Sequence, residues 1–119
     1  MNRAEFDRKV FSILYEMDIT PKGFYRYADF SELVGQQKPS WPLTTPLKVM
    51  VEILYVKPQI EQIIGFLKSA QDNQVSRSII FGIDSLTDAE KEKLNLSRYD
   101  IDYFDHSAID SLITEKSLT

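Results

Sequence analysis

The feature that most constrains the fold of this chain is the run Val49-Met50-Val51-Glu52-Ile53-Leu54-Tyr55-Val56, which carries a single charged residue. A run of β-branched and aliphatic residues of this length is typical of a strand that is covered on both faces. Glu52 is therefore expected in the protein interior, where an ionised carboxylate costs several kcal/mol unless it is paired, hydrogen-bonded, metal-bound or protonated. The burial of Glu52 needs a reason, and that reason is either chemistry or a local ion pair.

The sequence after this run predicts a β-strand, helix, β-strand unit. A helix is expected to open at Pro58, because the missing N–H of proline is harmless in a first helical turn. Residues 75–83 then form a second apolar run, centred on Ile79-Ile80-Phe81. A helix between two buried strands connects them in parallel. The helix itself is indicated by apolar residues at spacings of three and four, namely Ile60, Ile63, Ile64, Phe66, Leu67 and Ala70.

Shorter signals predict the remaining elements. Apolar spacing predicts a helix over residues 4–17, aromatic content predicts a strand over residues 24–30, and two prolines predict a loop over residues 36–45. The capping-box spacing of Thr87 and Glu90, repeated by Ser107 and Asp110, predicts two more helix starts, and residues 98–104 alternate as in an edge strand. Residues 1–119 are thus expected to form one α/β domain with a mixed sheet flanked by helices.

Composition narrows the class of protein. The chain has 119 residues, of which 43% are hydrophobic and 27% charged, and this is ordinary for one globular domain. It has no cysteine, and no apolar stretch approaches the roughly 18 residues of a membrane span, so we expect a cytoplasmic protein without membrane contact. The net charge of −4 argues against a dedicated nucleic-acid binder, because neutralising phosphates is the main source of non-specific affinity.

The order of elements, with an acid in the central strand, resembles the PD-(D/E)XK nuclease superfamily and most closely its Mrr-like restriction endonuclease branch. Three stretches carry the resemblance besides Glu5-Phe6-Asp7 at the start of the first helix: Val51-Glu52-Ile53-Leu54, then Ser78-Ile79-Ile80-Phe81-Gly82-Ile83 with the following Leu86-Thr87-Asp88-Ala89-Glu90, and Tyr99-Asp100-Ile101-Asp102-Tyr103-Phe104-Asp105. The resemblance covers nearly the whole chain and implies a restriction-endonuclease-like fold.

The resemblance also implies a site. Members of that superfamily hold Mg²⁺ between an Asp on one strand and an acid on the next, while a lysine two residues further on assists the attacking water. On this basis Asp29 and Glu52 are the candidate catalytic and metal-binding residues, with Glu32 in reserve for Asp29. The departure is Leu54, which stands where the superfamily has its lysine. In some members the lysine comes from the next helix, where this chain offers Gln62 or Lys68.

Simpler interpretations remain open for these residues. Glu52 can be a buried acid that pairs with Arg26 or Lys48, and Asp29 can be a solvated residue at a strand end. Residues 22–30 interleave cations with aromatic rings, which is a pattern suited to single-stranded nucleic acid. The candidate nucleic-acid-binding residues are Lys22, Tyr25, Arg26 and Tyr27.

Three functional hypotheses follow. The first is a catalytically degenerate nuclease-like module without a cofactor, which binds a protein partner or a second copy of itself and can contact nucleic acid. The second is an active Mg²⁺-dependent endonuclease that uses Asp29 and Glu52. The third is an unrelated small α/β regulatory or interaction domain, in which Asp29 and Glu52 would lie far apart.

Overall fold

The structure is a computed structural model, and it describes residues 2–39, 45–96 and 102–116. Its elements follow in the order α1 (Arg3–Glu16), β1 (Ile19–Arg26), β2 (Phe30–Gln37), β3 (Leu47–Leu54), α2 (Ile60–Asp72), β4 (Arg77–Gly82), α3 (Asp88–Leu96), β5 (Asp102–Phe104) and α4 (His106–Lys116). The predicted α/β class, with a mixed sheet flanked by helices, is confirmed.

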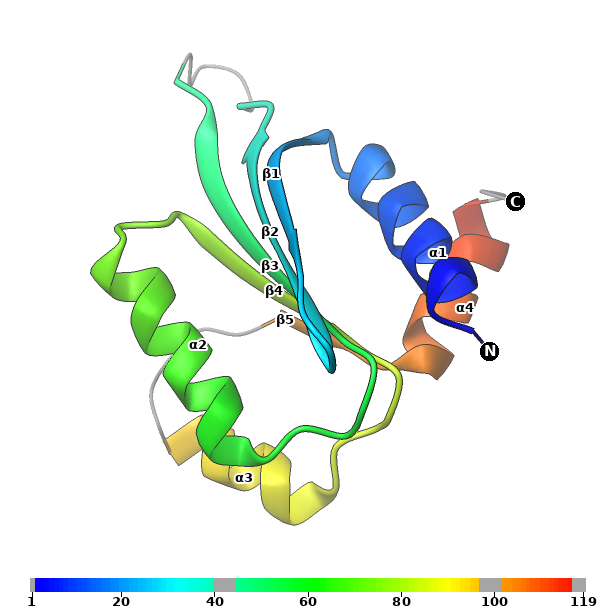
Figure 1. The fold of residues 1–119 in the computed structure, drawn as a ribbon, viewed down its shortest axis with the longest axis vertical. Coiled ribbons are helices and arrows are strands. Elements are labelled where there is room, and N and C mark those ends of the chain that lie inside the picture. Colours follow the sequence, from blue (N-terminus) through cyan, green and yellow to red (C-terminus); the bar gives the residue numbers. More distant parts are fainter. Residues whose placement is uncertain (1, 40–44, 97–101, 117–119) are drawn as a thin grey trace.

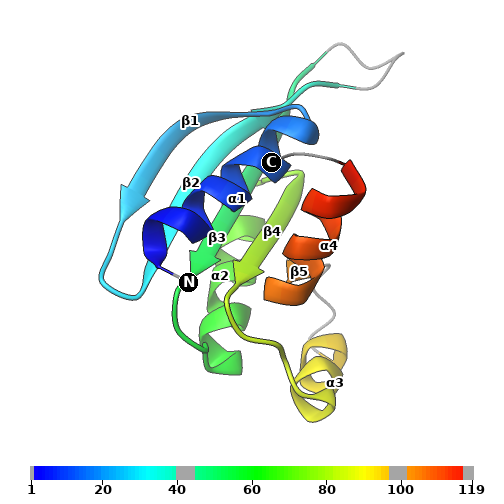
Figure 2. The same cartoon turned by 90° about the vertical axis from the view of Figure 1, so that its right-hand side faces the viewer.

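The five strands form one sheet in the order β1-β2-β3-β4-β5. Strands β1, β2 and β3 are an antiparallel meander, whereas β4 runs parallel to β3 and β5 runs parallel to β4. The parallel connection through α2 is the unit that the two apolar runs predict. Helices α1 and α4 cover one face of the sheet, and α2 and α3 lie on the other (Figures 1 and 2).

The central strand β3 contributes to two separate cores because its side chains alternate between the faces of the sheet. Val49, Val51 and Ile53 pack on the side of α1 and α4. Met50 and Leu54 pack on the side of α2 and α3. Glu52 has the same parity as Met50 and Leu54, so the alternation directs its side chain toward α2.

The structure corrects the prediction of one strand over residues 24–30. Arg26 ends β1, Phe30 starts β2, and the amide of Tyr27 donates to the carbonyl of Phe30 to close the turn between them. The strand β1 begins before this segment, at Ile19, and accommodates Pro21 beside a shift in register at residues 21–23. Proline is tolerated at such irregular edge positions because no ladder bond needs its amide.

Two predicted helix starts are also corrected, and one is confirmed. Pro58 lies before α2, whose N-cap is Gln59. Helix α4 is capped by Asp105, whose carboxylate accepts from the amide of Ala108, and not by Ser107. The capping box of Thr87 and Glu90 is formed, with bonds of 2.9 and 3.2 Å in the two directions.

The predicted edge strand and the expected absence of a membrane span can be compared with the described residues. In the predicted edge strand 98–104, residues 102–104 form β5 and the rest lies outside the described residues. No helix within the described parts of the chain is long and apolar enough to cross a membrane.

Candidate functional site

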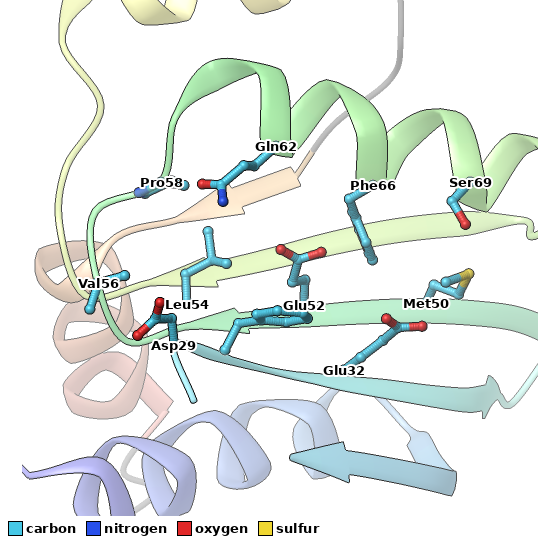
Figure 3. A pocket seen from close by; sticks show the side chains of 11 residues that line it. Asp29, Glu32, Met50, Glu52, Leu54, Val56, Pro58, Gln62, Phe66 and Ser69 are labelled. Carbon is cyan, nitrogen blue, oxygen red and sulfur yellow. The ribbon is translucent and has the colours of Figure 1, made fainter. Parts of the chain in front are cut away.

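A pocket of about 340 Å³ lies between the sheet and α2 on the face to which Glu52 points (Figure 3). Its walls come from β2, β3, the residues that link β3 to α2, and one side of α2. The lining residues are Asp29, Phe30, Glu32, Met50, Glu52, Leu54, Val56, Pro58, Gln62, Phe66 and Ser69. Asp29 and Glu52 therefore share one pocket, which is not what the hypothesis of an unrelated α/β domain expects.

Glu52 is the most buried carboxylate of this pocket. It is only 8% exposed, and no hydrogen bond or ion pair joins its side chain to another residue that the structure describes. The ion pairs considered from the sequence are not formed. Arg26 pairs instead with Asp7, and Lys48 donates to the backbone carbonyl of Asn73.

Glu32 faces Glu52 directly across the β2–β3 pair. Residues in such register have Cβ atoms roughly 4.5–5.5 Å apart, and like charges at this position repel. Burial, and secondly the charge of Glu32, raise the pKa of Glu52 from 4.5 to about 7. The carboxyl of Glu52 is therefore partly protonated near neutral pH, which lowers the cost of keeping it without a partner.

Asp29 lies in the β1–β2 turn and not within a strand. Its carbonyl accepts from the amide of Tyr55, and this bond ties the turn to the end of β3. Figure 3 shows its side chain near Val56, at the end of the pocket where β3 stops. Asp29 is exposed, so it meets the pocket at its edge while Glu52 lies inside.

The pocket lining contains no lysine or arginine. Leu54, which stands where the resemblance implies a lysine, lines the pocket. Gln62 also lines the pocket, and its side-chain oxygen accepts from the amide of Gln59 at the start of α2. Lys68 is exposed and is not part of the lining. None of the alternatives weighed from the sequence therefore places a cation beside Glu52.

A metal ion places requirements on the side chains that hold it. Mg²⁺ prefers near-octahedral coordination by hard oxygen ligands. Within the described residues, no group of three or more histidine, aspartate or glutamate side chains is close enough together to hold a metal ion. Asp29, Glu32 and Glu52 line the same pocket without forming such a group.

Two of the four candidate nucleic-acid-binding residues, Tyr25 and Arg26, lie on opposite faces of the sheet. Tyr25 is paired with Glu32 and so lies on the pocket face, whereas Arg26 is paired with Ser31 and contacts α1 through Asp7. Tyr27 stacks on Phe30, with ring centroids 4.7 Å apart. Lys22 is exposed at the shift in the β1–β2 register. The two tyrosines, 54% and 49% exposed, are an aromatic surface near the pocket, but Arg26 is not part of it.

Asp7 is a second buried acid, and its burial was not predicted from the sequence. One of its carboxylate oxygens accepts from the hydroxyl of Tyr55 at 2.5 Å. The other lies 3.0 Å from Arg26, in an ion pair whose angles fall outside hydrogen-bond geometry. The sequence does indicate this burial, because Asp7 shares a helical face with the apolar residues Val10 and Leu14 through spacings of three and four. This cluster joins α1 to β1 and to Tyr55, the residue that directly follows β3.

We expect Asp7→Ala to lower the free energy of unfolding by about 1–2 kcal/mol, because it removes a charged hydrogen-bond acceptor from buried surroundings. Arg26 is half exposed, so the loss of its ion pair adds little. Urea unfolding at pH 7 measures the change. Glu16→Ala, an exposed acid at the end of the same helix, is the control and should change stability by less than about 0.5 kcal/mol. Equal effects of the two substitutions would contradict a structural role of Asp7.

Comparison of the chain with family models, with curated proteins and with solved structures gave no match.

Proposed function

We infer that this protein is a nuclease-like domain that binds a ligand in the pocket at Glu52 and does not cleave phosphodiesters. The observation that carries the proposal is a pocket with three carboxylates and no lysine or arginine in its lining. A metal-dependent nuclease needs ligands that hold the metal, and members of the superfamily add a cation that assists the attacking water. The first requirement is met incompletely by these residues, and the second has no candidate in the lining.

The order of elements supports the nuclease-like part of the proposal. A helix, three antiparallel strands, a helix and a parallel strand follow one another from Arg3 to Gly82, with the buried acid in the third strand. This is the order on which the resemblance to the PD-(D/E)XK superfamily rests.

The surface around the pocket supports the binding part. Tyr25, Tyr27 and Val56 are exposed large hydrophobic residues, and Val56 lines the pocket itself. Exposed tyrosines are enriched at protein interfaces. A protein partner or a second copy of this chain is the macromolecule we propose for this surface, in the cytoplasm. Nucleic acid is less favoured, because phosphates would meet the acids of the pocket.

The alternative function is a Mg²⁺-dependent endonuclease. One observation favours it, since Asp29, Glu32 and Glu52 all line one pocket, as the ligands of a metal in a nuclease would.

A cleavage assay separates the two functions. In millimolar Mg²⁺ or Mn²⁺, we expect the wild-type chain to cleave supercoiled plasmid and single-stranded DNA no more than Glu52→Gln does. Glu92→Gln, an exposed acid on α3, is the matched control. Metal-dependent cleavage that persists in Glu92→Gln and is lost in Glu52→Gln would overturn the proposed function in favour of the endonuclease.

A further inference from the structure

The charge of the pocket is not balanced from within the protein. Glu52 is 92% buried, projects into the pocket and has no hydrogen-bond or ion-pair partner among the described residues. The cations nearest to it in the chain or in register are engaged elsewhere. Arg26 pairs with Asp7, Lys48 with a backbone carbonyl, and Lys57 with Glu90. A positively charged ligand that enters the pocket would pair with this buried carboxylate and offset the cost of its burial.

The rest of the lining indicates which kind of cation fits. Met50, Leu54 and Val56 are apolar, and two aromatic residues also line the pocket, Phe30 from β2 and Phe66 from α2. A hard metal ion gains nothing from such walls, because it requires oxygen ligands or water. An organic cation is stabilised by both the apolar and the aromatic residues, since its body buries apolar surface and its charge interacts favourably with aromatic rings.

We propose that this pocket binds a small organic cation, namely a protonated amine carried on an apolar or aromatic body. The ammonium group pairs with Glu52 and Glu32, and the body of the ligand lies between Phe30 and Phe66. The volume of about 340 Å³ is at the lower end of the roughly 300–1,000 Å³ of ligand pockets, which suits a small ligand. The inference rests on the proposed function, in which this pocket binds a ligand.

Binding is expected to be linked to pH. The other polar groups of the lining are Glu32 on β2, Gln62 and Ser69 on α2, and Asp29 at the end of the pocket, and the lining contains no lysine, arginine or histidine. Since the pKa of Glu52 is about 7, most of the carboxyl is protonated at pH 5.5 and must lose its proton to pair with the cation. The affinity for an amine should therefore rise roughly 30-fold between pH 5.5 and pH 8.

The experiment is a titration of the 119-residue chain, followed by NMR chemical shifts, with three ligands of similar shape and different charge. These are 2-phenylethylammonium, 2-phenylethanol and 3-phenylpropionate. The cation should bind at least about tenfold more tightly than the alcohol, and the anion should not bind. The shift changes should lie at Phe30, Glu52 and Phe66. In Glu52→Gln the affinity for the cation should fall at least about tenfold at pH 8 and its rise with pH should disappear, because only Glu32 is left to pair with it, whereas Glu92→Gln should behave like the wild type.

Two results would overturn the inference. The first is equal binding of the three ligands, or no binding of the cation at pH 8. The second is displacement of the amine by millimolar Mg²⁺, which would assign the pocket to a metal ion. If the amine does not bind and the cleavage assay shows no Glu52-dependent cleavage of DNA, only the inference of a cationic ligand is overturned. If Glu52-dependent cleavage is seen, the proposed function itself is overturned.

Discussion

Replacing Glu52 by glutamine is expected to stabilise the protein by about 3 kcal/mol at pH 8 and to leave its stability nearly unchanged at pH 4. Glutamine has almost the same shape as glutamic acid and cannot ionise. The substitution therefore removes the cost of a buried charge without opening a cavity. Functional sites commonly carry such a cost, because the group that binds a ligand is not the group that best stabilises the empty protein.

The sign follows from the pKa of Glu52 in the two states. Burial and the charge of Glu32 raise it from 4.5 to about 7 on folding. Below pH 4.5 the carboxyl is neutral in both states and has no effect. Between pH 4.5 and 7 the unfolded state loses its proton while the folded state keeps it, so the stability of the wild type falls as pH rises. Above pH 7 the loss of stability is complete, and it amounts to roughly 1.4 kcal/mol for each pH unit between 4.5 and 7.

Urea unfolding of the wild type and Glu52→Gln at pH 4, 6 and 8 measures this effect. Glu32→Gln should show a smaller gain at pH 8, because it removes the lesser cause of the raised pKa. Glu92→Gln is exposed and should follow the wild type at every pH. A difference between wild type and Glu52→Gln that does not change with pH would show that Glu52 is not a buried ionisable group.

The second large effect is expected at Gly82, where alanine should lower the free energy of unfolding by about 2–3 kcal/mol. A Cβ atom placed there would lie 2.1 Å from the hydroxyl oxygen of Tyr103 and 2.7 Å from Cζ of its ring. The ring cannot move freely, because its hydroxyl donates to the carbonyl of Asp84 at 2.9 Å. Strands β4 and β5 would have to separate, or this hydrogen bond would break.

Gly65 supplies the matched control for Gly82. It lies within α2, and a Cβ atom there would meet nothing within 4 Å. Gly65→Ala should therefore stabilise the protein by about 0.5–1 kcal/mol, because alanine loses less backbone entropy in a helix. In a Tyr103→Leu background, Gly82→Ala should cost much less than in the wild type. Thermal and urea unfolding of the four variants test this, and an undiminished cost would place its origin elsewhere than Tyr103.

Particular residues show which features of the fold could be predicted from the sequence. The helix over residues 4–17 and the two apolar runs on either side of α2 were located to within a few residues, because their periodicity is a local property. The turn at residues 27–29, between β1 and β2, was missed. Its aromatic residues continue across the turn, and β-propensity does not reveal where a strand reverses. The start of α4 was misplaced because Asp105 and Ser107 are both good caps, and only the surrounding packing selects between them.

The sequence by itself determined that an acid lies within the central buried strand and that no lysine follows it two residues later. Only the tertiary structure decided that Glu32 is its neighbour, that Arg26 is on the opposite face, and that α2 closes a pocket over it. The physical reason is strand register. A shift of one residue would move every side chain of β2 to the other face of the sheet, and register is set by packing between segments that are distant in the chain.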